Sequence, residues 1–548
     1  MKRLILIMAI LSLPAVAPLT QRGYFTMHDD LQAIRQLEMD KCWHDLQIPC
    51  RWVLDMGYGY GYPLFNYYPP LPYYLGELVH KLGWQFTDTV KVLGIVGFAA
   101  SLAGMYLLAA EFWGRRGGAL AALFYVYAPY HSTDYYVRGA INEFWALVWL
   151  PLIFWTIYRL IKDGAKWIPW VSLSVAALLL THNLTILIIV LPLILWTAIW
   201  VIKFKHFRST WYLAVSAIWA LGLAAFYTLP VLLEAKYVSL WTLTSGYFNY
   251  LAHFLDWRQM LLKINWGYGS SVYGPDDTMS LAVGYLHWLV PLAIVISTPF
   301  IAKLRSRVAL ILFALFSILY SLFMMHWKAT PVWLAIKPLE FLQFPWRFLT
   351  LSIFAGSFLA GAIELVNKRW LLPLLLLLLL ILNANYFRPR QWLPDINDSN
   401  KFTGHDWQWE VTGSIFDYLP IWAPRPPADP QPEALKFLTG SGVYEVNNYK
   451  TNFQQYSVEA SESATLEVQT YYFPGWRMWL DKLEVPIDPT RDPLLGRMQV
   501  EVTEGQHDLQ LKFLNTPVRF AANALSLIAW AMLILYFIPW PKKSRWEM

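Results

Sequence analysis

Charged residues are scarce in this sequence. Asp, Glu, Lys and Arg make up 15% of its 548 residues, whereas ordinary globular chains carry about 25%. Hydrophobic residues account for 57% and aromatic residues for 17%. This balance excludes an ordinary soluble domain and indicates an integral membrane protein with aromatic rings at its water–lipid boundaries.

Cysteine is also rare, and several catalytic motifs are missing. Cys42 and Cys50 are the only two cysteines, so a disulfide framework is excluded, although a single bridge between them is open. The chain has no Walker loop, HExxH, GxSxG or CxxC motif. These absences argue against a nucleotide-driven pump, a membrane zinc protease and an esterase.

Long apolar runs are what the chain does contain. A helix needs about 20 residues to cross about 30 Å of hydrocarbon. We predict about twelve transmembrane helices, at 4–19, 88–110, 117–130, 142–161, 168–181, 184–202, 210–232, 281–302, 308–326, 348–366, 370–386 and 519–540. The first run also has the outline of a cleavable signal peptide, but Pro18 at the would-be new terminus favours an uncleaved span.

The basic residues fit this topology. If the runs alternate in direction, every inner stretch is basic, as the positive-inside rule requires, and 327–347 is the exception on the outer side. We therefore predict a multi-pass protein of the cytoplasmic (inner) membrane, with both termini in the cytoplasm. The net charge of +6 is explained by these loops rather than by a nucleic acid partner. The inner basic residues are Lys2, Arg3, Arg115, Arg116, Arg159, Lys162, Lys166, Lys203, Lys205, Arg208, Lys303, Arg305, Arg307, Lys368, Arg369, Lys542, Lys543 and Arg545.

Three outer segments are long. Within a membrane module at 1–386, the outer loops 20–87 and 233–280 interrupt the spans. Segment 387–518 changes character, with a Pro-rich lead and then residues that alternate at period two between turn signals, which is typical of strands. We predict an extracytoplasmic β-rich domain there, with a small antiparallel sandwich at 435–516. Segment 519–548 supplies the final span and a basic tail.

Two acidic residues directly follow the first span. Asp29 and Asp30 precede a helical stretch, LQAIRQLEM. Carboxylates at a membrane boundary are partly desolvated and must be paired or used, so they are candidates for a general base or metal ligands. The alternative is that one of them caps the helix.

A second acidic group lies in the next outer turn. Asp134, Arg138 and Glu143 fall within ten residues between two spans. The cation can bind a phosphate while a carboxylate takes a proton. The alternative is a salt-bridge cluster that anchors the loop.

The remaining candidates are more scattered. His28 and His182 lie at outer turns, and Arg347 at the outer end of a span can snorkel or bind phosphate. Asp276 and Asp277 can cap the next helix or join Asp29 and Asp134 as metal ligands. A tyrosine-rich run forms an interfacial belt or lines a groove for substrate. Its candidate lining residues are Tyr60, Tyr62, Tyr67 and Tyr68.

Several motifs together resemble a known family. They are HDD, RQLEM, IPCRW, GYGYPLFNYYPPLPYYL, DYYVRGAINEFWAL, LTHN and FPWRFL, followed by YYFPGWRMWLDKLEV and GQHDLQLKFLNTPVRFAANALSL. The sequence resembles prokaryotic membrane proteins known as YfhO-like or "6-pyruvoyl-tetrahydropterin synthase-related". The pterin label does not indicate an activity, because the chain lacks even a His-x-His for a zinc site.

That family in turn resembles the GT-C glycosyltransferases. The resemblance implies a polyprenyl-phosphate-linked sugar donor and an essential acid in the first outer loop. Asp29 matches that position best, with Asp30 second, because this chain has Asp-Asp where many members have Asp-Glu. Asp134 and Glu143 correspond to acids of the second outer loop.

The chemistry that follows is inverting transfer of a sugar to an extracytoplasmic acceptor, which is an envelope glycan, a lipid or a protein. One acid serves as base, and Arg138, Arg347 or a divalent cation stabilises the leaving phosphate, with His28 and His182 nearby. A transporter or flippase of lipid-linked saccharides and a non-catalytic envelope-assembly protein are the alternatives. The sequence names neither the sugar nor the acceptor.

Overall fold

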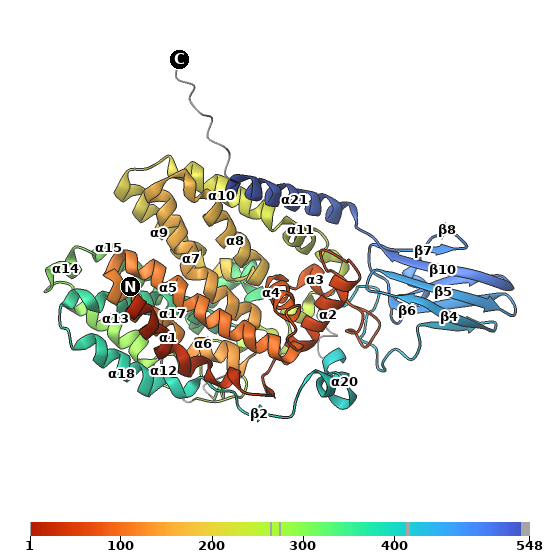
Figure 1. Cartoon of the computed structure of the whole chain (residues 1–548), viewed down its shortest axis with the longest axis horizontal. Coiled ribbons are helices and arrows are strands. Elements are labelled where there is room, and N and C mark those ends of the chain that lie inside the picture. The colour runs from red at the N-terminus through yellow and green to blue at the C-terminus, as the bar shows by residue number, and fades with distance from the viewer. Residues whose placement is uncertain (1, 264–265, 273, 275, 413–416, 539–548) are drawn as a thin grey trace, which may run out of the picture.

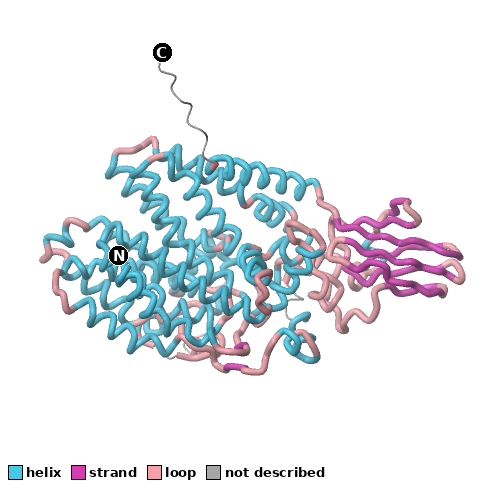
Figure 2. Tube along the Cα trace, viewed as in Figure 1, coloured by secondary structure: helices cyan, strands magenta, loops and turns pink. Residues whose placement is uncertain are grey.

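The computed structural model describes residues 2–263, 266–272, 274, 276–412 and 417–538. A large helical body carries a small group of strands at one end, and the final helix returns along the body (Figure 1). Colouring by secondary structure separates the two regions clearly (Figure 2). The architecture is therefore a polytopic helical protein with a β-domain, as the sequence predicts.

All twelve predicted spans coincide with helices. In order these are α1 (Lys2–Val16), α5 (Phe86–Val126, which holds two of the runs), α7 (Ile141–Asp163), α8 (Ile168–His182), α9 (Thr185–Phe204), α10 (Ser209–Leu223) with α11 (Ala225–Leu233), α13 (Tyr285–Ser297), α15 (Val308–Met325), α17 (Leu349–Ala360), α18 (Leu371–Asn383) and α21 (Pro517–Phe537). In the described chain, seven helices are long and apolar enough to cross a membrane alone, and α10 with α11, bent by 78°, makes an eighth. The shorter ones, such as the 13 residues of α13, reach only about 20 Å.

Helix α5 is a hairpin of two helices. Gly114 has φ +76° and ψ 172°, which are not helical angles. A Cβ on Gly118 would lie 2.8 Å from the Cβ of Ala110, whereas residues eight apart in a straight helix are about 12 Å apart. The chain therefore reverses at Gly114, and the two predicted spans 88–110 and 117–130 pack against each other.

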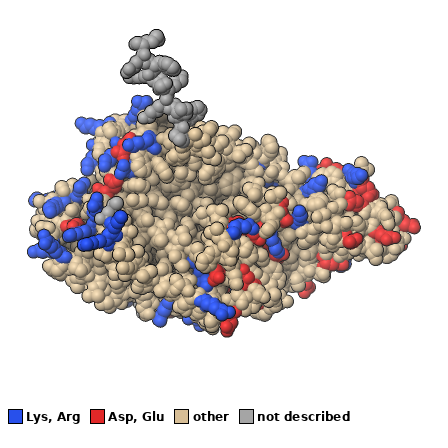
Figure 3. Space-filling model, viewed as in Figure 1, with Lys and Arg blue, Asp and Glu red and all other residues tan. Residues whose placement is uncertain are grey.

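The surface of the helical body matches a membrane protein. Large apolar side chains such as Leu232, Ile218 and Leu527 are exposed. Basic side chains gather at the end of the body away from the strands, and the middle of the visible face is largely uncharged (Figure 3). The predicted basic tail at Lys542, Lys543 and Arg545 lies outside the described residues.

The first outer loop is compact and helical. It contains α2 (Gln32–His44), α3 (Leu64–Tyr67) and α4 (Leu71–His80). Cys42 and Cys50 form a disulfide, so the single bridge that the sequence left open is present. The other short helices are α6 (Pro129–Ser132), α12 (Trp257–Leu261), α14 (Ala302–Arg305), α16 (Thr330–Ala335), α19 (Asp398–Lys401) and α20 (Gly404–Thr412), and a two-residue strand pair joins β1 (Tyr24–Phe25) to β2 (Trp392–Leu393).

The predicted antiparallel sandwich is present. One sheet has the order β4-β5-β10-β7-β8 and the other β3-β6-β9. Alternate residues of β5 face the shared core, as expected for strands with one buried face. The bounds are β3 (Leu435–Thr439), β4 (Gly442–Tyr449), β5 (Phe453–Ala460), β6 (Ala464–Tyr471), β7 (Trp476–Leu480), β8 (Leu483–Val485), β9 (Arg497–Val502) and β10 (Gly505–Phe513).

The first outer loop completes the core of the sandwich. Trp52 is fully buried, and its ring centroid lies 5.7 Å from those of Trp476 and Phe513. Where the sandwich meets the helical body, Arg519 at the start of α21 donates from Nε to Glu234 Oε2 at 2.8 Å. A buried pair of this kind needs both partners, because removing one leaves an uncompensated charge. The same guanidinium lies over the rings of Phe473 at 5.1 Å and Phe513 at 5.0 Å, which fixes the sandwich to the helical body.

The first half of segment 387–434 packs on the outer loops, whereas Leu419 and Ala423 further along belong to the core of the sandwich. Asp398 accepts hydrogen bonds from the backbone N–H groups of Phe86 at 2.7 Å and Thr87 at 3.0 Å, which caps α5. Lys401 reaches Asp30 Oδ2 at 2.9 Å and Glu410 Oε1 at 2.6 Å. This segment holds α19 and α20, and the strands of the sandwich begin only at Leu435.

Candidate functional site

The turn between α5 and α7 positions an acid–arginine group. After α6, residues Thr133–Val137 form one π-helical turn, closed by the N–H of Arg138 donating to the carbonyl of Thr133 at 2.9 Å. Gly139 follows with φ +65°, and a Cβ there would lie 2.3 Å from Sδ of Met27. The turn therefore needs glycine, and it aims Arg138 at the first residues of α7.

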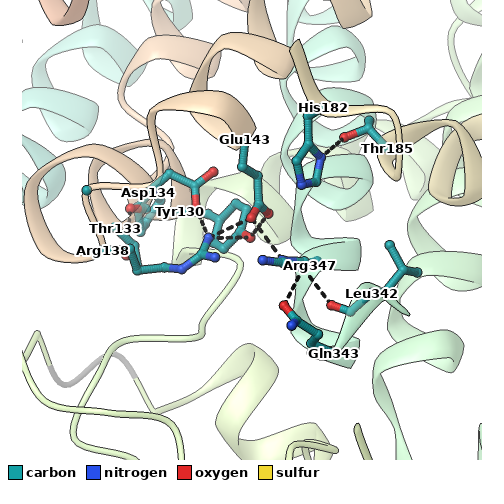
Figure 4. A network of polar contacts seen from close by, with 12 residues as sticks. Tyr130, Thr133, Asp134, Arg138, Glu143, His182, Thr185, Leu342, Gln343 and Arg347 are labelled. Carbon is teal, nitrogen blue, oxygen red and sulfur yellow. Dashed lines mark hydrogen bonds and ion pairs between the residues drawn. The ribbon is translucent and has the colours of Figure 1, made fainter. Parts of the chain in front are cut away.

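Five residues form what we call the arginine cluster: Tyr130, Asp134, Arg138, Glu143 and Arg347. Arg138 Nη1 donates to Asp134 Oδ1 and, at 2.8 Å, to Glu143 Oε2. Arg347 Nε donates to the same Glu143 oxygen at 3.0 Å, and the Tyr130 hydroxyl to Oε1 at 2.5 Å. Glu143 is thus the shared acceptor at the centre (Figure 4).

Both arginines are held with hydrogen-bonding capacity to spare. The guanidinium of Arg138 stacks on Trp346 at 4.6 Å and makes its protein hydrogen bonds through Nη1. Arg347 Nη1 donates to the carbonyl of Leu342 at 2.8 Å and to Gln343 Oε1 at 3.3 Å. The remaining guanidinium nitrogens are available to an anion in the adjoining space.

The first outer loop brings Asp29 to this cluster. The N–H of His28 donates to the carbonyl of Val137 at 3.0 Å, and the N–H of Asp29 to that of Arg138 at 2.9 Å. The Asp29 carboxylate accepts from Arg35 Nη1 at 2.8 Å and Gln32 Nε2 at 3.0 Å. Its side chain is 34% exposed, so it is anchored yet accessible.

The helix-cap interpretation of Asp29 and Asp30 is wrong. Helix α2 begins at Gln32, its N-cap is Leu31, and no side chain caps it. Asp29 is instead bound by two side chains of that helix, and Asp30 by Lys401. The two carboxylates point to different partners because the chain turns sharply before α2.

A cavity of about 760 Å³ collects most of the predicted residues. Apolar side chains from α11 and the second outer loop, including Leu232, Leu240 and Phe248, line another part of it. Because Leu232 is largely exposed on the helical body, the cavity reaches the apolar surface. The predicted residues that line it are His28, Asp29, Tyr62, Tyr67, Tyr68, Arg138, Glu143, His182 and Arg347.

Other predicted residues lie outside this lining. Asp30 pairs with Lys401, and Tyr60 packs on Tyr471 of the sandwich at 5.5 Å. Asp134 is 0% exposed behind Arg138. Asp277 accepts from Gln259 Nε2 at 2.7 Å and from the N–H of Val272 at 2.8 Å, and it caps no helix.

Two histidines complete the polar part of the wall. His182 Nδ1 pairs with the hydroxyl of Thr185 at 2.7 Å, which turns the other ring nitrogen toward the cluster (Figure 4). His28 Nε2 pairs with the carbonyl of Tyr268 at 2.9 Å. Within the described ranges, no three His, Cys, Asp or Glu side chains converge as a metal site, and the proposed ligands Asp276 and Asp277 do not line the cavity that holds Asp29.

Sequence reasoning missed several lining residues. Arg35, Asp417, Tyr418, Asn142 and Gln343 all face the cavity. Arg35 could have been found, because it is the first basic residue of the helical stretch that directly follows Asp29 and Asp30. Asp417 follows α20 in segment 387–434, whose sequence has neither a helical nor a strand period. No sequence signal therefore identifies it as a site residue.

Burial changes the acidity of two carboxyls outside the spans. It raises the pKa of Asp417 to about 6, with Arg35 opposing and Asp29 reinforcing the shift. It also raises the pKa of Asp134 well above its ordinary value, because the nearby Glu143 charge adds to the desolvation. Burial thus shifts Asp134 toward its protonated form, and Arg138 opposes that shift.

No family model matches the chain, and no curated protein matches it either. Among solved structures, the arabinofuranosyltransferase AftD from Mycobacteria is 14% identical, covering 72% of this chain and 28% of that one, with a TM-score of 0.47. An Archaeoglobus fulgidus oligosaccharyltransferase tethered with an acceptor peptide is 14% identical, covering 72% and 56%, with a TM-score of 0.41. The chain spans between about a quarter and just over half of their lengths, and likenesses of this size do not establish a function. The YfhO-like assignment stays a prediction.

Proposed function

We propose that this protein is a membrane glycosyltransferase that moves a sugar from a polyprenyl-phosphate carrier to an extracytoplasmic acceptor with inversion. The observation that supports it is one cavity in which an accessible carboxylate, Asp29, faces the same space as Arg138 and Arg347. An apolar wall continues that space to the surface of the helical body. Base, anion site and lipid access are the three parts that such a reaction needs.

The arginine cluster suits the donor phosphate. Two arginines face Glu143, and burial shifts the remaining acid, Asp134, toward its protonated form, so the cluster favours an anion. Positioned cations stabilise the charge that develops on the leaving phosphate, and they do so most strongly where water is excluded. The polyprenyl chain then lies along the apolar wall formed by Leu232, Leu240 and Phe248.

Asp29 suits the base. It removes the proton from an acceptor hydroxyl as the oxygen attacks the anomeric carbon. The carbon–oxygen bond to phosphate breaks at the same time, and polyprenyl phosphate leaves with the electron pair. Arg35 and Gln32 hold the carboxylate in place, which supplies the orientation on which such catalysis depends.

The test is sugar transfer by the purified protein in detergent. The donor is undecaprenyl phosphate carrying radiolabelled mannose, glucose or arabinose, and the acceptors are octyl glycosides of the same sugars. Asp29→Asn is expected to lower kcat about 100-fold or more, since general base catalysis contributes about 10²–10⁴. Asp30→Asn, which alters the neighbouring carboxylate outside the cavity, is expected to keep most turnover.

Equal turnover by folded Asp29→Asn and wild type would show that Asp29 is not the base. Release of no sugar from any donor by wild type would favour the transporter alternative, which moves the lipid without breaking a bond. Repeating the wild-type assay with a chelator decides whether a divalent cation assists the arginines.

A further inference from the structure

The C-terminal part of the chain contributes its own wall to the cavity. Residues 419–421 pair with the second outer loop: the N–H of Ser239 donates to the carbonyl of Leu419 at 2.8 Å, and the N–H of Ile421 to that of Tyr237 at 3.1 Å. This pairing fixes the preceding Asp417 and Tyr418 against the cavity. Their position is therefore set by backbone hydrogen bonds to the second outer loop and by the packing of Leu419 in the sandwich core.

Asp417 is a carboxylate placed for a ligand. Its Oδ1 accepts a long hydrogen bond of 3.4 Å from the Thr242 hydroxyl, and no lysine or arginine of the described chain forms an ion pair with it. Arg35 acts on it from nearby, but the Nη1 of Arg35 is already bonded to Asp29 and Tyr68. A half-buried carboxylate with so little protein hydrogen bonding has acceptor capacity left for a bound molecule.

Aromatic faces surround this carboxylate. Tyr418 stacks on Tyr67, with ring centroids 5.5 Å apart and planes 16° apart. Tyr67 is fixed in turn, because its hydroxyl donates to the carbonyl of Glu234 at 2.7 Å. Tyr68 lies under the guanidinium of Arg35 at 4.4 Å. Rigid rings beside a carboxylate match a sugar, whose C–H faces are apolar and whose edges donate hydrogen bonds.

The charges around the cavity favour the acceptor sugar over the donor sugar at the end that holds Asp417 and Tyr418. At the acid–tyrosine end two carboxylates, Asp29 and Asp417, share one arginine, Arg35. The donor phosphate is therefore attracted more strongly by the arginine cluster than by this end. The acid–tyrosine end is left for a partner that is neutral and rich in hydroxyl groups. The same end holds Asp29, the proposed base, so a hydroxyl bound there is already beside the group that takes its proton.

We propose that Asp417 is an acceptor-binding residue, and that with Tyr418 and Tyr67 it forms a subsite for a carbohydrate acceptor next to Asp29. This rests on the proposed function and adds the class of acceptor to it. The carboxylate of Asp417 accepts hydrogen bonds from two hydroxyls of the acceptor sugar, and the stacked tyrosines support its ring.

The experiment separates transfer to the acceptor from hydrolysis of the donor. Full-length protein in detergent receives the same undecaprenyl-phosphate sugars, with octyl glycosides as acceptors or with water alone. Asp417→Asn is expected to raise the acceptor KM about 10–100-fold, as loss of hydrogen bonds to a charged group would. The donor KM and the rate of donor hydrolysis are expected to stay unchanged, and Asp417→Glu is expected to recover part of the acceptor KM.

The control variant is Asp492→Asn. Asp492 is a buried carboxylate in the sandwich, paired with Arg497 at 2.7 Å and outside the cavity lining, so it should leave both KM values unchanged. An unchanged acceptor KM in Asp417→Asn would overturn the subsite. The proposed function would still stand if the wild-type protein cleaved the donor. Transfer only to peptides, and not to glycosides, would also overturn it. If the wild-type protein cleaves no donor, both the proposed function and the subsite are wrong.

Discussion

Glu143 and Asp134 are both acids of the arginine cluster, yet they have different surroundings. Glu143 accepts hydrogen bonds from Tyr130, Arg138 and Arg347. Asp134 is paired with Arg138 alone, its Oδ2 lacks a hydrogen-bond partner, and burial raises its pKa. Glu143 therefore carries the charge that balances the two arginines, whereas burial shifts Asp134 toward its protonated form.

This difference gives a prediction for matched amide variants. Asp134→Asn is expected to keep turnover within about fivefold of wild type, because an amide resembles a neutral carboxylic acid. Glu143→Gln removes the shared charge, so turnover is expected to fall at least about 100-fold as both arginines lose their orientation. Steady-state kinetics of the two purified variants provides the measurement. Equal losses in both would show that Asp134 is ionised or acts directly.

The sequence predicts the residues near span ends better than those that long-range pairing brings in. Asp29, Arg138, Glu143 and Arg347 all adjoin an apolar run, so the membrane boundary identifies them. Asp417 lines the same cavity only because 419–421 pairs with 237–239. Such irregular pairing has no periodic signal, and Tyr60 shows the converse error, since a tyrosine-rich run does not tell which rings face the sandwich.

At the scale of elements, Lys401 holds α20 on the first outer loop. It lies between Asp30 and Glu410, and burial raises the pKa of these two carboxyls to about 6 and about 7. A raised folded-state pKa means that the folded protein binds protons more tightly than the unfolded chain does. Stability is therefore greatest at low pH in this range and falls as pH rises from about 4 to about 7.

Glu410→Gln should flatten this dependence. Raising the Glu410 pKa from 4.5 to about 7 corresponds to about 3 kcal/mol of unfolding free energy lost across that range. The amide cannot ionise, so the variant is expected to lose less stability than wild type between pH 5 and 8. Thermal unfolding of both proteins in detergent over this range is the measurement, and parallel curves would contradict the account.

Elements were easier to predict than their lengths. All twelve apolar runs are helical, but α8, α13 and α18 are shorter than a full crossing. The hairpin at Gly114 joins two runs that hydropathy separates only by Arg115 and Arg116. Period-two alternation predicted the sandwich well, because each strand has one buried face.

For the whole molecule, basic side chains of the helical body gather at the end opposite the sandwich (Figure 3), as the predicted orientation requires. Both native cysteines are in a disulfide, so a new cysteine is a clean probe. Ser461→Cys, on an exposed turn of the sandwich, is expected to react with a membrane-impermeant maleimide in intact cells. Lys205→Cys, exposed after α9, should react only after lysis. The reverse pattern would invert the topology.

The buried ring of Trp52 has a further meaning for how the protein moves. That side chain belongs to the loop bearing Asp29 but fills a space among Phe473, Trp476 and Phe513. Pulling the two regions apart would expose a large aromatic surface to water, which is strongly unfavourable. Loop and sandwich are therefore expected to shift together, so a partner that binds the strands acts on the loop that bears Asp29.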